Sequence, residues 1–325
     1  IDKEIVTVNF KNFENIQDYF KGKIIGEELY LNDKKLIIDK NLILPKDLTL
    51  NINQDQQIIL ANNSSLVLYG DLNITGVKDN PVIIKGSVDK PGSIISIGNK
   101  LDLKNVEFTN LKFPSLKGYE LYSGLNIIDA EVKMKNIKIS EFIGEDMINL
   151  INSNTKIQNL FLENSKSDAL DSDKGSINFV GITCKNIGND CIDISNTKIE
   201  GINLFSEKVS DKTLSLGENS RANLKNVEIF SSEIGIAVKD ASIANIENVL
   251  IAKTTLPIAV FVKKFEYGPA SLNAKNLKLQ DSNKIFLVDN LSELTIENKR
   301  ILGQFSGKEI ESKLYGNEYG KATLR

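Results

Sequence analysis

The sequence predicts an all-β solenoid, a parallel β-helix with about 22 residues in each coil. Two series of residues, two positions apart, recur at an interval of 22. A fixed period of about 20–50 residues indicates repeats that stack on one another. Residues around the first series alternate between apolar and polar, as in a strand. The first series is Ile148, Leu170, Ile192, Leu214, Ile236 and Ile258, and the second is Leu150, Ser172, Ile194, Leu216, Val238 and Val260.

A column of turn residues supports these coils. Eight Asn or Gly residues, each flanked by a polar and an apolar residue, follow one another in steps of 20 to 31 residues. Asn and Gly tolerate the positive φ that a tight turn between strands requires. The longer steps indicate inserted loops, the largest including Lys112 to Ser123. The eight residues are Asn105, Asn136, Asn159, Gly181, Gly201, Asn226, Asn248 and Asn276.

The remaining elements follow in chain order. Residues 1–34 are interpreted as an N-terminal cap, in which 13–20 form a short amphipathic helix or a loop over the first coil. Residues 35–298 form the coils, because short runs of Ile, Leu and Val are separated by Asn, Gly, Asp and Lys. Residues 299–325 are expected to cap the last coil, since an open end exposes unpaired strand edges. No linker interrupts the pattern, so we expect a single domain, 1–325.

Two other repeat or layered folds fit the sequence less well. A doubly wound α/β fold needs helical stretches between its strands, and none is apparent. A leucine-rich repeat has a helix or its equivalent in each unit and a leucine-dominated pattern. Here Ile and Leu are mixed, and both halves of each unit have an extended pattern.

Composition excludes several classes of function. The net charge is −3, and acidic and basic residues are interspersed along the chain. The sequence therefore lacks the clustered basic residues that are typical of a nucleic-acid binder. No apolar run approaches the roughly 18 residues of a membrane span. The chain has no histidine, which removes histidine bases, histidine metal ligands and Ser–His or Cys–His nucleophile pairs. Chemistry must therefore use Asp, Glu, Lys, Arg or Tyr.

The cellular compartment is inferred from weaker signals. The chain begins at Ile1 rather than at Met, as it would after removal of a signal peptide or after shortening. Cys184 and Cys191 lie seven residues apart and form either one disulfide in an oxidising compartment or two buried thiols. We expect an extracellular, periplasmic or cell-surface protein.

Outward-facing positions of consecutive coils gather charge. Coils stack at the strand spacing of about 4.8 Å, so aspartates on adjacent coils form a patch two coils high. Like charges at that distance raise one another's pKa. Lysines follow on the coils beyond. The aspartates are Asp168, Asp171, Asp173, Asp190 and Asp193, the lysines are Lys212, Lys239, Lys263 and Lys264, and Glu218 and Asp240 end strands beside them.

This arrangement suggests a groove for a sugar chain, with carboxylates at one end and lysines and aromatic rings at the other. Carboxylate pairs act as general acid and base on a glycosidic bond, or hold Ca²⁺. A lysine with a lowered pKa abstracts a proton in a lyase or epimerase. Candidate catalytic positions are Asp168, Asp171, Asp190, Asp193 and Lys239; candidate substrate-binding positions are Asp146, Lys212, Glu218, Phe261, Lys263, Lys264 and Tyr267; candidate calcium ligands are Asp171, Asp173 and Asp193.

A second interpretation of the same residues stays open. Asp and Asn are common at the turns of parallel coils, where their side chains accept hydrogen bonds from nearby backbone amides. On this interpretation the charged positions form a solvated face or dock a protein partner.

Seven segments of the chain resemble a bacterial family of exported, right-handed parallel β-helix proteins, some of which lie beside spore-coat H-type kinase domains. The resemblance implies the right-handed fold and implies no particular activity. The segments are GEDMINL (144–150), SDALDSDKG (167–175), IGNDCIDIS (187–195), SDKTLSLGENS (210–220), IGIAVKDAS (234–242), VKKFEYGPA (262–270) and LYGNEYGKATLR (314–325).

Four shorter elements are similar to polygalacturonases, which are also right-handed β-helices. SDALD (167–171), GNDC (188–191), SDKTLSLG (210–217) and AVK (237–239) stand where that family has its motifs. The similarity implies that Asp168 and Asp190 match aspartates that act in catalysis, and that Lys239 matches a substrate-binding lysine. Asn189 replaces an aspartate, Ala237 stands where arginine is expected, and the family's histidine is absent.

These observations lead to one hypothesis and one alternative. The hypothesis is an exported β-helix protein that binds an acidic polysaccharide and acts on it as a hydrolase, lyase or epimerase. The alternative is a structural or adhesive cell-surface module without catalysis.

Overall fold

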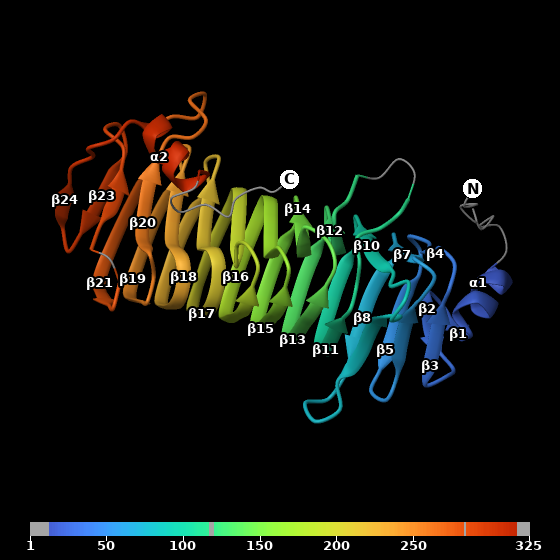
Figure 1. Cartoon of the computed structure of the whole chain (residues 1–325). Helices are drawn as coiled ribbons and strands as arrows, with labels where there is room; N and C mark the ends of the chain where they lie inside the picture. The colour runs from blue at the N-terminus through green and yellow to red at the C-terminus, as the bar shows by residue number, and fades with distance from the viewer. Residues whose placement is uncertain (1–12, 117–119, 283, 317–325) are drawn as a thin grey trace. The chain divides into compact units, whose positions relative to one another are not determined.

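The computed structural model describes residues 13–116, 120–282 and 284–316 (Figure 1). The chain is 66% strand and about 4% helix, and the described residues form a β-solenoid of about 12 turns with about 23 residues per turn. The predicted parallel β-helix is therefore confirmed. Two compact units, Ile1–Lys156 and Ile157–Arg325, divide the chain, and the single domain stays a prediction. No helix among the described residues is long and apolar enough to cross a membrane.

Unit 1 begins with helix α1 and an antiparallel hairpin, and continues as parallel coils. Strand β1 pairs antiparallel with β2, and β2 then pairs in parallel with β5. Residues 1–12 of the expected cap lie outside the described residues. The elements are α1 Phe13–Phe20, β1 Gly22–Ile25, β2 Glu28–Leu31, β3 Lys35–Ile38, β4 Leu42–Leu44, β5 Thr49–Asn53, β6 Gln57–Leu60, β7 Ser65–Leu68, β8 Asp71–Thr75, β9 Val82–Gly86, β10 Ser93–Ile97, β11 Lys100–Thr109, β12 Ser123–Ile128, β13 Glu131–Phe142 and β14 Asp146–Ile151.

Unit 2 holds the longer coils, and strand β15 spans the boundary between the units. The strand registers of unit 2 reproduce the interval of 22. Leu170 pairs with Ile192, and Leu214 and Ile258 both pair with Ile236. The elements are β15 Asn154–Ser165, β16 Asp168–Ile187, β17 Ile192–Gly217, β18 Arg221–Lys239, β19 Ile243–Ala252, β20 Leu256–Phe261, β21 Ser271–Gln280, β22 Phe286–Val288, β23 Glu293–Ile296, β24 Lys299–Ile301 and α2 Gly307–Leu314.

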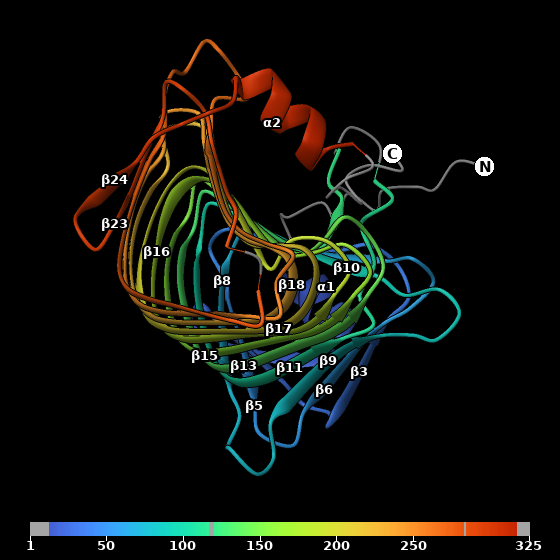
Figure 2. The ribbon, with the colours of Figure 1, turned by 60° about the vertical axis from the view of Figure 1, so that its left-hand side comes forward.

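The C-terminal segment leaves the parallel pattern in two steps. Strand β24 pairs antiparallel with β23. Helix α2 then lies against the outside of the coils of unit 2 (Figure 2). The C-terminal segment therefore covers part of the lateral face of unit 2, and its capping of the last coil stays a prediction. Its residues 317–325 lie outside the described residues.

The turn column exists, with one member different from the prediction. Asn203, and not Gly201, has the positive φ, 65°. Gly201 lies within β17, where an added Cβ would approach the ring of Phe179 to 2.3 Å, so the glycine makes room for that ring. With Asn203 in the column, the irregular steps of 20 and 25 residues become 22 and 23, counted from Gly181 to Asn203 and on to Asn226.

Side-chain amides join successive coils along this column. Asn226 donates its Nδ2 to Oδ1 of Asn203, and Asn248 donates to Asn226, both over 3.0 Å. Asn276 continues the chain of bonds to Asn248 at the same distance. All four asparagines have φ between 51° and 65°. This asparagine ladder, Asn203, Asn226, Asn248 and Asn276, thus has two roles. Each asparagine adopts the positive φ that its turn requires, and the side-chain amides form hydrogen bonds between successive coils.

We expect Asn226→Ala to lower the free energy of unfolding by about 2 kcal/mol. Alanine at φ 57° is strained, and two ladder bonds are lost. Urea denaturation measures the change. The matched control is Asn226→Gly, which loses the same bonds without the strain and should cost about half as much. Equal losses in the two variants would contradict the role of the backbone conformation.

Candidate functional site

A β-bulge in β17 lies next to a buried cluster of charged side chains in unit 2. Val209 pairs with Ser232, but Lys212 pairs with Ile234, so β17 carries an extra residue between them. Bulges interrupt the alternation of side chains along a strand. The consecutive residues Asp211 and Lys212 are both buried, with 1% and 3% of their surface exposed, and burial continues through every residue to Gly217. Lys212 Nζ lies 2.5 Å from Oδ2 of Asp211.

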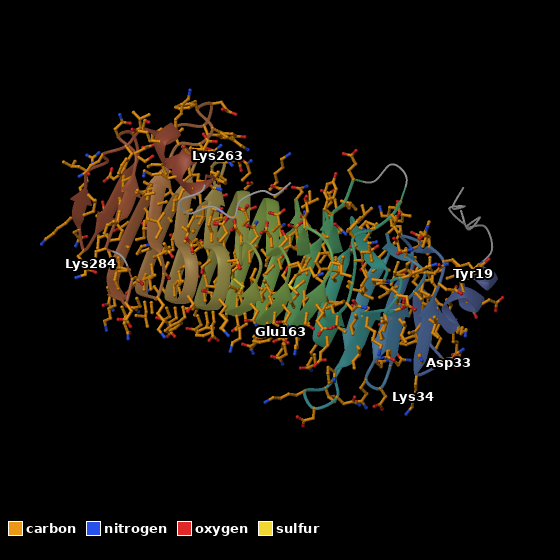
Figure 3. The ribbon with its side chains drawn as sticks, in the orientation of Figure 1. Tyr19, Asp33, Lys34, Glu163, Lys263 and Lys284 are labelled. Carbon is orange, nitrogen blue, oxygen red and sulfur yellow. A yellow bond between two sulfur atoms is a disulfide. The ribbon has the colours of Figure 1, made fainter. Side chains whose placement is uncertain are left out.

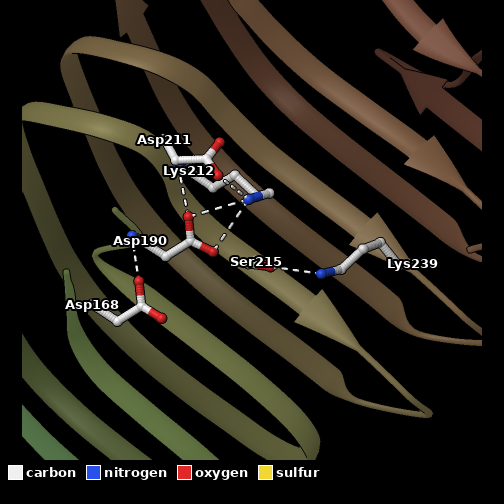
Figure 4. A network of polar contacts seen from close by, with 6 residues as sticks. All are labelled: Asp168, Asp190, Asp211, Lys212, Ser215 and Lys239. Atoms are coloured by element: carbon white, nitrogen blue, oxygen red, sulfur yellow. Dashed lines mark hydrogen bonds and ion pairs between the residues drawn. The ribbon is translucent and has the colours of Figure 1, made fainter. Parts of the chain in front are cut away.

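Asp190, 22 residues before Lys212 and therefore on the preceding coil, completes what we call the buried triad, Asp190, Asp211 and Lys212 (Figure 4). Lys212 Nζ lies 3.3 Å and 3.4 Å from the two oxygens of Asp190. The backbone N–H of Lys212 also donates to Asp190 Oδ1, over 2.9 Å. Among the described residues, Oδ1 of Asp211 has no hydrogen-bond partner. Two carboxylates thus share one ammonium inside the protein.

The shared ammonium determines how the triad titrates. Burial raises the pKa of Asp190 to about 7; Lys212 opposes this shift and Asp211 adds to it. Burial acts to lower the pKa of Lys212, but the carboxylates of Asp190 and Asp211 outweigh it and hold that pKa above its ordinary value. Lys212 therefore stays charged, and Asp190 is the group that takes up a proton near neutral pH.

Cys191 holds Asp190 in place from the neighbouring position. A disulfide joins Cys184 at the end of β16 to Cys191, and both residues are fully buried. Of the two alternatives for the cysteines, the structure therefore contains the disulfide. Asp190 in turn donates its backbone N–H to Oδ1 of Asp168 over 2.8 Å. Asp168 therefore agrees with the second interpretation of the charged residues, in which an aspartate side chain accepts a hydrogen bond from a backbone amide at a turn.

Lys239, at the end of β18, is a second buried cation. It is 8% exposed, and its Nζ donates to Oγ of Ser215 over 2.9 Å. Burial acts to lower the pKa of Lys239, but Tyr315 and Asp193 raise it above its ordinary value. The pKa of Lys264 is also raised, chiefly by its hydrogen bond to Glu218. The lysine with a lowered pKa is therefore not found in Lys212, Lys239 or Lys264, and that part of the prediction is wrong for these three.

Glu218 and Asp240 bind groups of the protein itself. Oγ of Ser195 donates to Glu218, and Nζ of Lys264 forms an ion pair with it. Oδ1 of Asp240 accepts the backbone N–H groups of Lys263 over 2.7 Å and of Lys264 over 2.6 Å. These two carboxylates shape the loop that follows β20.

Asp171, Asp173 and Asp193 are the half-buried carboxylates of the patch. Asp171 pairs in register with Asp193 on the next coil, whereas Asp173 pairs with Ser195. Burial, Asp193 and Glu218 raise the pKa of Asp173. Among residues 13–116, 120–282 and 284–316, no group of three or more Asp, Glu, Cys or His side chains is arranged to hold a metal ion. The predicted calcium site is thus corrected, because Asp173 lies two positions along the strand from the Asp171–Asp193 pair.

Helix α2 covers the coils of β18, β20 and β22. A capping box of Ser306 and Glu309 starts the helix. Its buried residues Ile310 and Leu314 pack in one cluster with residues of three coils. The coil residues in this cluster are Ile234, Ala237, Leu256, Ala259, Phe261 and Leu287. Phe261 is fully buried, so we leave it out of the proposed ligand surface.

Tyr315 is a site residue that the sequence interpretation missed. It follows α2 directly, and its ring centroid lies 4.0 Å from Nζ of Lys263 and 5.5 Å from Nζ of Lys212. Lys263 is labelled beside α2 in Figure 3. Cations over an aromatic face are attracted by its negative quadrupole. The sequence contained one sign that a protein segment covers this region. Ala237 and Ala259 place two small apolar residues in a column that is otherwise polar.

Two predicted residues are not members of this group. Asp146 belongs to unit 1, where it is buried and accepts a hydrogen bond from Oγ of Ser123 over 2.7 Å. Tyr267 is half-buried in the loop after β20, and its N–H donates to the carbonyl of Lys264. We therefore define the charged face as Asp171, Asp173, Asp193, Lys239 and Lys263 with Tyr315.

No family model matches this chain, and no curated protein sequence matches it. The resemblance to the exported bacterial family therefore stays a prediction. Among solved structures, the catalytic domain of a GH87 alpha-1,3-glucanase in complex with tetrasaccharides is similar, with 12% identity and a TM-score of 0.51. The match covers 86% of this chain and 64% of that domain, so the chain spans somewhat less than two thirds of it.

Two further solved structures are similar at lower TM-scores. A mutant of the periplasmic alginate epimerase AlgG has 9% identity and a TM-score of 0.46, with 89% of this chain and 81% of that chain covered. The Streptococcus pneumoniae surface protein and adhesin PfbA has 11% identity and a TM-score of 0.44, with 85% and 94% covered. Similarity at these identities concerns the fold alone.

Proposed function

We propose that this chain is a carbohydrate-active β-helix protein that binds an acidic polysaccharide on the charged face. Lys239 carries the proposal. An ammonium has three donors, and burying a charge without a counter-charge costs free energy. Among the described residues, no carboxylate lies within ion-pair distance of Lys239, and Ser215 accepts one of its hydrogen bonds. Asp193 already favours the charged form of Lys239, and a ligand carboxylate would accept a hydrogen bond from a donor that Ser215 leaves unused.

The geometry of stacked coils supports a polymeric ligand. Asp171 and Asp193 repeat one position on adjacent coils, and Ser215 continues that column at the same interval of 22. Adjacent strands are about 4.8 Å apart, which is close to the length of one sugar unit. A polysaccharide lying across the strands would therefore meet equivalent polar positions with successive sugars.

Acid–base chemistry on the bound polymer is the second candidate, and Asp173 favours it. This carboxylate is half-buried, and its pKa is raised by burial, Asp193 and Glu218. Carboxylates with raised pKa values are suited to general acid catalysis. Lys239 stays protonated and would stabilise negative charge that develops on the substrate. Without such chemistry, the same face is that of a binding or adhesive module.

An exported location agrees with this proposal. The disulfide between Cys184 and Cys191 is of a kind that persists in oxidising compartments and is rare in the cytosol. Titration of the isolated protein with a thiol-reactive probe, with and without reductant, tests whether the bond is present.

We expect Lys239→Met to weaken binding of polygalacturonate or alginate at least tenfold, because the charge that pairs with the ligand carboxylate is removed. Calorimetric titration of both polymers, with neutral dextran alongside, measures the change. The matched control is Lys225→Met, which removes an exposed lysine of unit 2 that pairs with Glu247. Equal affinities in the two variants, or no preference for the acidic polymers over dextran, would sink the proposal.

A product assay on the polymer that binds separates the two candidate functions. Chromatography of the incubated polymer detects shortened chains, and proton NMR detects an epimerised sugar. Products that are lost in Asp173→Asn support catalysis. Binding without any product leaves a polysaccharide-binding module.

A further inference from the structure

Gly217, the last residue of β17, interrupts an outward column of polar side chains. The column holds Asp173, Ser195, Gly217 and Lys239 on successive coils. Glycine in a strand is explained either by a backbone conformation that other residues avoid or by a close approach of neighbouring atoms. Gly217 has no positive φ, so its conformation does not require glycine. The explanation therefore lies in the atoms around it.

The side chain of Lys239 lies over Gly217. A Cβ added to Gly217 would be 3.8 Å from Cε of Lys239 and 3.4 Å from Oγ of Ser195. One methyl group fits at these distances, whereas a branched side chain would displace one of the two neighbours. Lys239 is thus directed back across the coil of Gly217, and its Nζ donates to Oγ of Ser215 over 2.9 Å (Figure 4).

We infer that Gly217 is a positioning residue of the proposed ligand site, because it gives the Lys239 side chain room to lie flat and to hold its ammonium beside Ser215. The inference rests on the proposed function. Asp193, 22 residues before Ser215, favours the charged form of the same ammonium. Lys239 is only 8% exposed, so a bound carboxylate meets an ammonium with one fixed direction.

An ammonium that is fixed in advance favours the binding of a ligand carboxylate. A lysine that moves freely loses rotamer freedom when it binds, and that loss weakens the affinity. Lys239 has given up this freedom on folding, since its side chain is buried and its ammonium is hydrogen-bonded. With a bulkier residue in place of Gly217, Lys239 would stand away from the sheet and remain mobile. Gly217 therefore acts on affinity through Lys239 and needs no contact with the ligand.

Chemical acetylation of the protein without ligand tests this arrangement. Limiting acetic anhydride labels lysines according to the accessibility of their amines, and mass spectrometry measures each one, with the exposed Lys225 as reference. Gly217→Val adds a branched side chain that strands favour, and it should raise the labelling of Lys239 severalfold. Gly217→Ala should give a smaller rise, and it replaces the valine variant if that one does not fold. Ser215→Ala removes the acceptor and shows how strongly a released Lys239 is labelled. Labelling of Lys239 that does not rise when Gly217 is replaced overturns the inference.

A double-mutant cycle connects the arrangement with the proposed function. Gly217→Val should weaken binding of polygalacturonate or alginate about fivefold, because the ammonium loses its fixed place. In the Lys239→Met background the same substitution should have no further effect, since it acts through that lysine. Equal losses in both backgrounds overturn the inference and leave the proposed function intact. Absence of binding of both polymers to the wild type instead removes the proposed function, and with it the role of Gly217 toward a ligand.

Discussion

Replacing Lys212 by methionine is expected to lower the free energy of unfolding by about 3–5 kcal/mol, as typical for breaking a buried ion pair. Lys212 is the ammonium that Asp190 and Asp211 share, and all three residues are buried. Methionine fills a similar volume but leaves two carboxylates inside the protein with no counter-charge. Urea denaturation followed by circular dichroism measures the loss.

Two further variants show whether charge, and not packing, causes this loss. The triple variant Asp190→Asn, Asp211→Asn, Lys212→Met keeps the shapes and removes every charge, so it should recover most of the stability. Lys225→Met breaks the exposed ion pair with Glu247 and should cost less than 1 kcal/mol, as surface pairs do. If Lys212→Met cost no more than Lys225→Met, the triad would not hold a desolvated charge.

The inward columns of unit 2 could be predicted because the physical constraint on them is strong. A strand with one buried face cannot slip by one residue without exposing its apolar side chains, so the interval of 22 fixes the register. Leu214, Ile236 and Ile258 accordingly stack in the predicted order and are fully buried. The outward columns follow from the same register, which explains why Asp171 and Asp193 were correctly placed side by side.

The burial of Lys212 could not be predicted, because the alternation of exposed and buried residues on which the prediction depends does not hold from Asp211 to Gly217, where every residue is buried. A period of 2 places consecutive residues on opposite faces, so it cannot bury both Asp211 and Lys212. The sequence analysis therefore predicted that Lys212 lies on a ligand-binding surface, whereas in the structure Lys212 forms buried ion pairs with Asp190 and Asp211. The interval between paired residues of β17 and β18 changes from 23 at Val209 to 22 at Lys212, and only the structure reveals this change.

Tyr315 was missed and Phe261 was misplaced for a different reason. Their environment is made by α2, a segment that returns from the end of the chain and has no counterpart in the repeat. Stacking on a period describes contacts between repeats and contains no information on a helix that packs across them. The apolar residues Ala237, Ala259 and Phe261, taken together, mark a covered area in hindsight.

The second large effect is expected in how stability depends on pH. The pKa of Asp190 lies near 7 in the folded protein, against an ordinary value of 3.8, because burial disfavours its charged form. The folded state therefore binds the proton more tightly than the unfolded state. The contribution of Asp190 to stability is largest below about pH 4 and is lost as pH rises from about 4 to about 7.

Asp190→Asn is expected to gain about 2–3 kcal/mol in unfolding free energy relative to the wild type between pH 5 and pH 8. Asparagine still offers an oxygen to the backbone N–H of Lys212 but does not titrate. Lys212 stays protonated over this range, so it adds no slope of its own. The comparison requires urea denaturation of both proteins at each pH, with the exposed Asp102→Asn as control. A constant difference in unfolding free energy between wild type and Asp190→Asn across this range would mean that the proton is held by another group. A difference that grows with pH in this variant, and not in Asp102→Asn, places the proton on the buried carboxylate of Asp190 beside Lys212.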